Sequence, residues 1–437
     1  MADFARSAHP GVQAQLDRLA KLSPAGDRLG LERIAAVLER LGRPQDKLPP
    51  VFHVAGTNGK GSTVAFLRAS LEAFGYKAHV FTSPHLVRFN ERIRIAGRLI
   101  DDEALQDLLA EVLDAGAGIE PSFFEVATAV AILAFARTPA DACILEVGLG
   151  GRLDATNIIE RPLVTGIADL ALDHQHFLGS RLTDIAGEKA GIAKCGVPLV
   201  TQNYSPRVAR RIGEIAEEVG ALWLPRDRSW NASERGGQLH YQDGEGNLDL
   251  PLPTLEGAHQ ARNASLAVAM LRHQRELPVP AEAIAEGLKA ARWPGRLQLL
   301  GPGPLTAKLP GRRVWVDGGH NRGASLAIAK QMADRAPFDL IFALMRTRRI
   351  SDVLGPLAPL VRKAHVIPLP GHPHHDPRDI AMFAQNRLGP RETYPAFTLD
   401  QAIERLAKDP AGRPDVLIFG SLYMAGEVLA ANEELPA

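Results

Sequence analysis

The sequence of 437 residues predicts an α/β protein with two domains. Patterns typical of strands alternate with patterns typical of helices, which favours a mostly parallel sheet covered by helices on both faces. A glycine-rich segment separates an early strand from the helix that follows it. Proline and glycine cluster between residues 293 and 313, which is a linker composition, and the alternation restarts after it.

Helical spacing of apolar residues defines the helices of the first domain. This spacing occurs over residues 31–41, 64–74, 101–113, 123–137 and 182–194. Short apolar runs between these segments predict buried strands at 51–54, 77–82, 142–147 and 163–168. The segment 240–250 has DGEGN between apolar ends, which predicts a hairpin.

The second domain shows the same alternation on a smaller scale. Strands are predicted at 314–317, 338–344, 365–369 and 415–419. Helices are predicted at 325–335, 352–362, 399–407 and 423–431. We therefore expect an N-terminal domain over residues 1–295 and a smaller, Rossmann-like α/β domain over residues 296–437.

Composition and charge exclude several classes of protein. Lysine and arginine together number 50, as do aspartate and glutamate, which argues against a broad nucleic-acid-binding surface. The longest nearly uncharged apolar run, residues 126–136, is too short to span a bilayer, and the N-terminus lacks the apolar core of a signal peptide. The two cysteines are expected to be reduced. Together these features predict a cytoplasmic protein with no membrane or nucleic-acid partner.

The glycine-rich segment has the features of a phosphate-binding loop. It has the sequence AGTNGKGST over residues 55–63 and lies between a predicted strand and a predicted helix. Glycines let backbone N–H groups point at phosphates, the helix N-terminus adds partial positive charge, and Lys60 can reach the β- and γ-phosphates. The first domain is therefore expected to have a P-loop-type fold. An ordinary glycine-rich turn is the alternative.

This loop departs from the common Walker A pattern. Val54 stands where that pattern has its first glycine, and Gly61 stands where it has the hydroxyl residue that binds Mg²⁺. Ser62 could partly replace that hydroxyl. Further metal ligands are therefore expected at the carboxyl ends of neighbouring strands.

Three polar residues follow predicted strands at that edge of the sheet, namely Ser83, Glu146 and His174. Each has a plainer interpretation. Ser83 could cap a turn, Glu146 could pair with Lys60, and His174 could be a surface loop residue. Their shared position beside the phosphate loop favours metal ligation instead.

A series of short segments then resembles one enzyme family. In chain order these are GTNGKGS (56–62), TSPHL (82–86), NERI (90–93), FFE (123–125), LEVGLGGRLDATN (145–157), DH (173–174), GEKAGI (187–192), PGRLQ (294–298), DGGHN (317–321) and GSLYMAGEV (420–428). They resemble folylpolyglutamate synthases, and more closely the bacterial bifunctional dihydrofolate synthase/folylpolyglutamate synthase family of the Mur ligase superfamily. The resemblance runs from about residue 27 to residue 428.

This resemblance implies an ATP- and Mg²⁺-dependent amide ligase. The γ-phosphoryl group of ATP would activate a substrate carboxylate as an acyl phosphate, and the amino group of L-glutamate would then attack it. The implied substrates are dihydropteroate, tetrahydrofolate and L-glutamate, all small molecules, and two Mg²⁺ sites are expected. The enzyme is expected to be a monomer.

The resemblance also assigns residues to the nucleotide and the metals. It places the nucleotide against Gly56, Thr57, Asn58, Gly59, Lys60, Gly61, Ser62, Asn263, Arg296, Asp317 and His320. Ser83 and Glu146 would hold one Mg²⁺, and Glu146 with His174 a second. Lys189 matches the family lysine that is carbamylated, and it completes a catalytic set of Lys60, Glu146, His174 and Lys189. Without the resemblance, an exposed helix lysine is the simpler interpretation of Lys189.

The matching positions for the substrates are Ser122, Phe124, Arg152, Asp154, Ala155 and Ser421. In bifunctional relatives, the positions that match 122–125 and 153–155 line a pocket for the pterin of dihydropteroate. A flat heterocycle can stack on Phe124, and its N–H groups can donate to Asp154. The alternative is that Phe124 is a core residue and Asp154 only caps a loop. A folylpolyglutamate synthase without dihydrofolate synthase activity is the alternative function.

Some positions depart from the family. Gly319 and Arg322 stand where the family usually has alanine and proline, and MRTRR at 345–349 stands where it usually has an Asp-Lys-Asp cluster. Two other functions share some of these features. A cell-wall Mur ligase would need a further N-terminal domain, for which the 55 residues before Gly56 are too few. A P-loop switch protein would need neither paired metal ligands nor Asp317 and His320.

Overall fold

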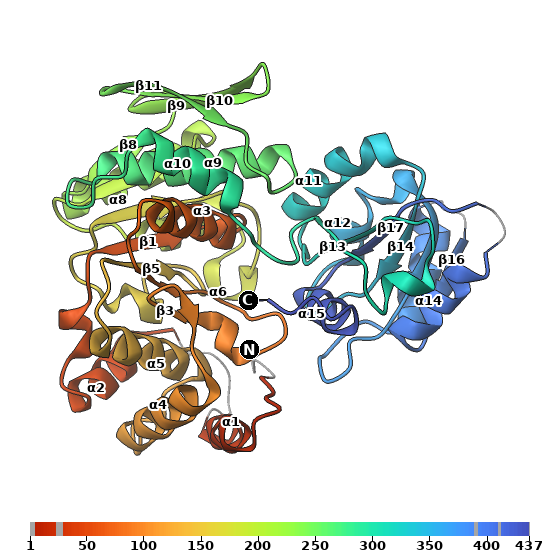
Figure 1. Ribbon diagram of the computed structural model, residues 1–437, viewed down its shortest axis with the longest axis horizontal. Helices are drawn as coiled ribbons and strands as arrows, with labels where there is room; N and C mark the ends of the chain where they lie inside the picture. Colours follow the sequence, from red (N-terminus) through yellow and green to blue (C-terminus); the bar gives the residue numbers. More distant parts are fainter. Residues whose placement is uncertain (1–4, 23–28, 389–391, 410–411, 437) are drawn as a thin grey trace. The chain divides into compact units, whose positions relative to one another are not determined.

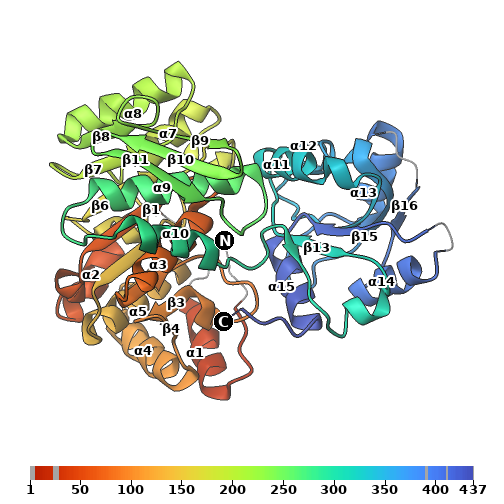
Figure 2. The ribbon, with the colours of Figure 1, turned by 45° about the horizontal axis from the view of Figure 1, so that its top comes forward.

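The computed structural model describes residues 5–22, 29–388, 392–409 and 412–436. The chain forms two compact units, drawn from two directions in Figures 1 and 2. The first comprises residues 1–254 and 260–292, and the second comprises residues 255–259 and 293–437. The predicted division into functional domains at residues 295 and 296 stays a prediction. Both cysteines are free, and no helix in the described ranges is long and apolar enough to cross a membrane.

The first unit is built on an eight-stranded sheet with the order β4-β3-β2-β5-β1-β6-β7-β8. Six strands are parallel, namely β1 (Val51–Ala55), β2 (Ala78–Phe81), β5 (Ala142–Glu146), β6 (Val164–Ile167), β7 (Pro198–Thr201) and β8 (Leu222–Pro225). The short strands β3 (Ile93–Ile95) and β4 (Arg98–Leu99) add an antiparallel edge. This sheet confirms the predicted α/β class and places β1 between β5 and β6.

Helices cover both faces of this sheet (Figure 1). They are α1 (Pro10–Leu22), α2 (Glu32–Arg40), α3 (Lys60–Ala73), α4 (Asp102–Ala115), α5 (Phe123–Arg137), α6 (Gln175–Leu178), α7 (Leu182–Ala190), α8 (Pro206–Val219), α9 (Ala258–His273) and α10 (Ala281–Ala290). Helix α5 is apolar on all sides and almost wholly buried, as expected for a helix packed between a sheet and further helices. Helices α3 and α10 touch where a side chain at Gly287 would strike the Ser70 backbone.

A separate three-stranded sheet follows α8 in the chain. It contains β9 (Trp230–Arg235), β10 (Gln238–Asp243) and β11 (Gly246–Pro251), all antiparallel, and it lies beside α10 (Figure 1). The predicted hairpin at 240–250 corresponds to β10 and β11. Strand β9 was not predicted, because only Trp230 and Ala232 in it alternate as buried apolar residues.

The second unit has a six-stranded sheet with the order β12-β13-β17-β14-β15-β16. Its strands are β12 (Gln298–Leu299), β13 (Val314–Asp317), β14 (Phe338–Phe342), β15 (Val361–Val366), β16 (Glu392–Pro395) and β17 (Val416–Phe419). All are parallel except β12. The helices are α11 (Arg322–Met332), α12 (Ile350–Leu354), α13 (Pro377–Phe383), α14 (Leu399–Ala407) and α15 (Leu422–Ala431).

One helix of this unit was predicted too long. The apolar pattern predicted a helix over 352–362, but α12 ends at Leu354. Gly355 and Pro356 follow it, and Pro359 comes within a short 3₁₀ turn, so a regular helix cannot continue. Residues 361 and 362 already belong to β15.

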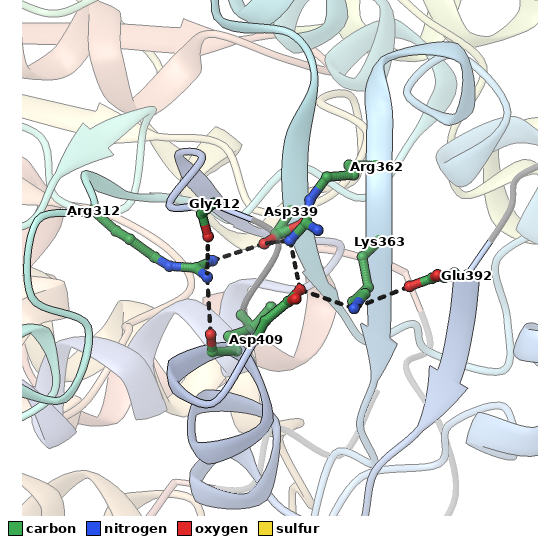
Figure 3. Close-up of polar contacts among 8 residues, drawn as sticks. Arg312, Asp339, Arg362, Lys363, Glu392, Asp409 and Gly412 are labelled. Atoms are coloured by element: carbon green, nitrogen blue, oxygen red, sulfur yellow. Dashed lines mark hydrogen bonds and ion pairs between the residues drawn. The ribbon is translucent and has the colours of Figure 1, made fainter.

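A buried ion-pair network holds the amino ends of β14 and β15 together (Figure 3). Asp339 is fully buried and accepts hydrogen bonds from Arg312 (2.7 Å) and Arg362 (2.7 and 2.9 Å). Arg362 and Lys363 both donate to Asp409 at 2.8 Å. A buried charge is tolerated only when it is paired in this way. The network lies at the opposite ends of the strands from Asp317, so we assign it to the stability of the sheet.

Candidate active site

The predicted phosphate loop lies at the carboxyl edge of the first sheet, between β1 and α3. The backbone N–H groups of Thr57 and Asn58 donate to the carbonyl oxygen of Asp169, which follows β6, at 2.8 and 3.1 Å. The Thr57 hydroxyl donates to the carbonyl of Ala171 at 3.1 Å. These bonds tie the start of the loop to the neighbouring strand and leave its later residues at the N-terminus of α3.

Gly59 is required by both backbone conformation and space. Its φ of +83° lies in the left-handed region, which favours glycine. A Cβ atom added there would lie 2.2 Å from Oδ1 of Asn263, on α9. Asn263 is buried and lies far from the loop in the sequence, but the fold places it against Gly59. The two predicted nucleotide contacts are therefore adjacent.

Lys60, Ser83 and Glu146 come together at this edge. Glu146 is the last residue of β5 and pairs in register with Val54 of β1. Its Oε1 lies 3.9 Å from Nζ of Lys60, and its Oε2 accepts the backbone N–H of Ser83 at 3.3 Å. Glu146 therefore pairs with Lys60, which was the alternative interpretation of this residue, and it contacts Ser83 as well.

The chemistry of these donors fits a magnesium ion. A serine hydroxyl and a carboxylate are hard oxygen ligands, and Mg²⁺ usually keeps several water ligands beside one or two such groups. The described parts of the chain contain no cluster of three or more His, Cys, Asp or Glu side chains that could hold a metal by themselves. A cation here would therefore depend on substrate phosphates for part of its coordination.

His174 lies in the segment that follows β6. It adopts a left-handed conformation with φ of +48° and starts the short helix α6. Its backbone N–H donates to Oδ1 of Asp173 at 2.6 Å, and its Nε2 lies 3.8 Å from the same oxygen. Asp173 is buried, so it fixes the turn that presents the imidazole. The role of His174 in binding a metal stays a prediction.

Lys189 is buried, unlike the exposed helix lysine that its sequence context suggested. It lies near the end of α7, and its Nζ is 3.5 Å from the carbonyl oxygen of Gly150. Burial above all, together with the charge of Lys60, lowers the pKa of Lys189 to about 7, against the opposing effect of Asp154 and Glu188. A substantial fraction of this amine is therefore neutral near neutral pH.

The residues predicted to bind the pterin lie on α5 and in the segment after β5. Phe123 is buried in the core, whereas Phe124 is half-buried and packs so closely on Gly148 that a Cβ atom there would lie 2.4 Å from its ring. Asp154 is buried, which raises its pKa, while hydrogen bonds from Leu149, Thr156 and Gly148 oppose that rise. Phe124 and Asp154 thus border the same loop.

Other predicted substrate residues have structural partners. Ser122 and Glu125 form a reciprocal cap at the start of α5, with bonds of 2.6 and 3.3 Å. Arg152 is exposed and pairs with Glu188 of α7 at 2.9 Å. Ala155 is buried at the start of a 3₁₀ turn. These contacts give each residue a role in the fold, and their contacts with substrate stay predictions.

In the second unit, Asp317 ends β13 and is buried. Its carboxylate accepts the backbone N–H groups of Leu297 (2.8 Å) and Gly319 (2.6 Å), so it shapes the turn that carries His320. His320 contacts the carbonyl of Gly318 through Nδ1 at 3.0 Å. Ser421 caps α15, and Arg296 is half-buried just before β12.

One buried pair in the segment that follows β2 was not predicted. The guanidinium of Arg92 donates from Nε to Nδ1 of His85 at 2.8 Å and lies against the rings of Phe89 and Phe123. Arg92 is only 1% exposed. Both residues fall within segments that carried the family resemblance, but an arginine followed by an apolar residue gives no sign of burial in the sequence alone.

Known proteins resemble this chain over most of its length. The bifunctional dihydrofolate synthase/folylpolyglutamate synthase of Bacillus subtilis is 36% identical over 358 residues, covering 78% of this chain and 81% of the relative. The Escherichia coli enzyme of the same name is 35% identical over 406 residues, covering 92% and 90%. The chain belongs to the dihydrofolate synthase/folylpolyglutamate synthase family. No family model matches the sequence.

Solved structures agree with this membership. Escherichia coli FolC in complex with DHPP and ADP superposes with a TM-score of 0.87 at 33% identity, covering 98% of both chains. A bifunctional folylpolyglutamate synthase/dihydrofolate synthase with Mn, AMPPNP and L-glutamate bound has a TM-score of 0.83 at 33% identity, covering 98% of this chain and 99% of that one. Membership of the dihydrofolate synthase/folylpolyglutamate synthase family confirms the predicted fold and the predicted enzyme class, an ATP-dependent glutamate ligase.

Proposed function

We propose that this dihydrofolate synthase/folylpolyglutamate synthase adds L-glutamate both to dihydropteroate and to reduced folates, using ATP and Mg²⁺. The observation that carries the proposal is the grouping of Lys60, Ser83 and Glu146 beside the phosphate loop. A cation, a carboxylate and a hydroxyl at the N-terminus of a helix suit the transfer of a phosphoryl group, in which most of the catalysis is positioning and charge stabilisation.

In the first step, an oxygen of the substrate carboxylate attacks the γ-phosphorus of ATP. The bond from that phosphorus to the bridging oxygen breaks, and ADP leaves with the negative charge. Lys60 stabilises the charge on the transferred group, and the N–H groups at the start of α3 hold the phosphates. Bound Mg²⁺ would neutralise phosphate oxygens, with Ser83 and Glu146 as its protein ligands.

In the second step, the neutral amino group of glutamate attacks the carbonyl carbon of the acyl phosphate. Inorganic phosphate leaves, and the nitrogen loses a proton to give the amide. A free carboxylate is a poor electrophile, so the acyl phosphate supplies the leaving group that the reaction needs. Arg296, Asp317, His320 and Ser421 of the second unit are proposed to contact the nucleotide and glutamate, with an ATP-binding domain over residues 1–295 and a ligase domain over 296–437.

Lys189 is proposed to carry a carbamate. Carbamate formation needs a neutral amine to attack CO₂, and the lowered pKa of Lys189, about 7, supports this reaction near neutral pH. The product is an anion, which suits a position beside Lys60 and a second Mg²⁺ that Glu146 and His174 would share. An unmodified ammonium group would instead repel both cations.

Recognition of dihydropteroate is proposed to involve Phe124 and Asp154. Phe124 is half-buried beside Gly148, and a ring of this kind can stack on a pterin. The Asp154 carboxylate can accept from a pterin N–H group. We also propose that the enzyme acts as a monomer in the cytoplasm.

An oxygen-transfer experiment tests the proposed chemistry. Dihydropteroate or tetrahydrofolate labelled with ¹⁸O in the reacting carboxylate is incubated with enzyme, ATP, Mg²⁺ and glutamate. An acyl phosphate intermediate moves one labelled oxygen into inorganic phosphate, which mass spectrometry detects. Amide formation with unlabelled phosphate from either substrate would contradict the mechanism, and label transfer from tetrahydrofolate alone would leave only the folylpolyglutamate synthase activity.

A further inference from the structure

Asp154 is held by the loop that carries it. Its Oδ2 accepts the backbone N–H of Leu149 at 2.8 Å, and the backbone N–H of Gly148 also donates to its carboxylate. Its Oδ1 accepts two bonds from Thr156, one from the backbone N–H at 3.0 Å and one from the hydroxyl at 2.5 Å. A carboxylate oxygen has two acceptor positions, so Thr156 fills Oδ1.

The short bond from the Thr156 hydroxyl fixes where its proton lies. A distance of 2.5 Å is typical of a hydroxyl that donates to an ionised carboxylate. Because threonine has one hydroxyl proton, Oγ1 must act as an acceptor towards its other neighbour. That neighbour is Nε2 of His53, at 2.8 Å.

His53 therefore carries its proton on Nε2 and donates it to Thr156. His53 lies in β1, is fully buried and is separated from Thr156 by 103 residues of sequence. Burial above all, together with the charge of Lys194, lowers the pKa of His53 to about 3, so the ring is neutral at physiological pH. The three side chains form one directed chain of hydrogen bonds from β1 to the loop after β5.

We propose that His53 and Thr156 are positioning residues for dihydropteroate, which hold the Asp154 side chain in place and turn its Oδ1 away from the substrate. This inference rests on the proposed role of Asp154. Oδ1 is therefore not available to the pterin. Asp154 cannot bind one pterin ring through both of its carboxylate oxygens at once.

Thr156→Val tests the proposal, because valine keeps the shape of threonine and removes only the hydroxyl. We expect kcat/KM for dihydropteroate to fall by about tenfold, mainly through KM, as for the loss of a hydrogen bond to a charged group. The value for tetrahydrofolate should change by less than about twofold. Thr156→Ser, which restores a hydroxyl, should recover most of the dihydropteroate reaction. His53→Phe, like Thr156→Val, should lower kcat/KM for dihydropteroate.

Thr165→Val is the matched control. Thr165 is equally buried in β6, but its hydroxyl donates to the carbonyl of Pro198. Thr165→Val should leave the ratio of the kcat/KM values for dihydropteroate and tetrahydrofolate unchanged. If Thr156→Val lowers kcat/KM equally for both substrates, Thr156 is only structural and the proposal is wrong. The proposal is also wrong if Thr156→Ser is as impaired with dihydropteroate as Thr156→Val. If the wild type neither binds nor converts dihydropteroate, the dihydrofolate synthase part of the proposed function fails together with this inference.

Discussion

Removing the ammonium group of Lys60 is the perturbation whose effect can be worked out most fully. Lys60 lies 3.9 Å from the Glu146 carboxylate, and both side chains are largely buried, at 15% and 5% exposure. At an effective dielectric constant of about 20, the attraction between two charges at this distance is about 4 kcal/mol. Lys60→Ala therefore leaves Glu146 without its cation and removes a charge that stabilises the transferred phosphoryl group.

We expect Lys60→Ala to lower kcat by about 10²–10³, or about 2.7–4 kcal/mol, as for other electrostatic stabilisers of a transition state. A second effect should follow at Lys189. Because Lys60 lowers the pKa of Lys189, its loss raises that pKa, and less neutral amine is present at pH 7. Added bicarbonate should therefore restore a small part of the lost activity.

The assay is ADP release at saturating ATP, Mg²⁺ and glutamate, with either folate substrate. Lys47→Ala, which removes an exposed lysine in a 3₁₀ turn before β1, is the control and should keep wild-type turnover. Near-wild-type kcat for Lys60→Ala under these conditions would remove Lys60 from the mechanism. A loss restricted to the KM for ATP would limit its role to binding.

Three further predictions concern other residues. Turnover should fall as pH decreases through about 7, because Lys189 becomes protonated and cannot form a carbamate. A short carboxylic acid should partly restore the activity of Lys189→Ala. An unmodified Lys189 in a metal-loaded crystal at neutral pH would contradict the proposed carbamate. Asp154→Ala should reduce kcat/KM for dihydropteroate by about tenfold more than for tetrahydrofolate, and equal losses would contradict its proposed role. Asp339→Ala should lower the free energy of unfolding in urea by about 3–5 kcal/mol, because it removes the buried carboxylate that Arg312 and Arg362 share. Glu392→Ala removes the more exposed partner of Lys363 and should change the free energy of unfolding by less than about 1 kcal/mol.

Local sequence signals predicted much of the fold. The helix predicted over 123–137 matches α5, because Ser122 and Glu125 cap it and the apolar run fills it. The helix over 399–407 matches α14, where Thr398 is the N-cap. The phosphate loop was placed correctly between β1 and α3. In each case, residues within a few positions of one another determine the structure.

Features set by distant residues could not be predicted. The lowered pKa of Lys189 depends on burial beneath the segment at Gly150, which only the folded chain creates. The bonds that turn Asp154 depend on His53, 103 residues before Thr156. The short strands β3 and β4 contain too few residues to show a periodic pattern. For such features, tertiary contacts decide what the local sequence leaves open.

The most direct test of the proposed activity is the substrate dependence of ADP release. Purified enzyme is incubated with ATP and Mg²⁺, with dihydropteroate or tetrahydrofolate added singly, in the presence and absence of L-glutamate. Sustained ADP release should require glutamate and should occur with each of the two substrates, in equal amount to the amide formed. Sustained ADP release without glutamate, or none with either substrate, would contradict the assignment of this site to glutamate ligation.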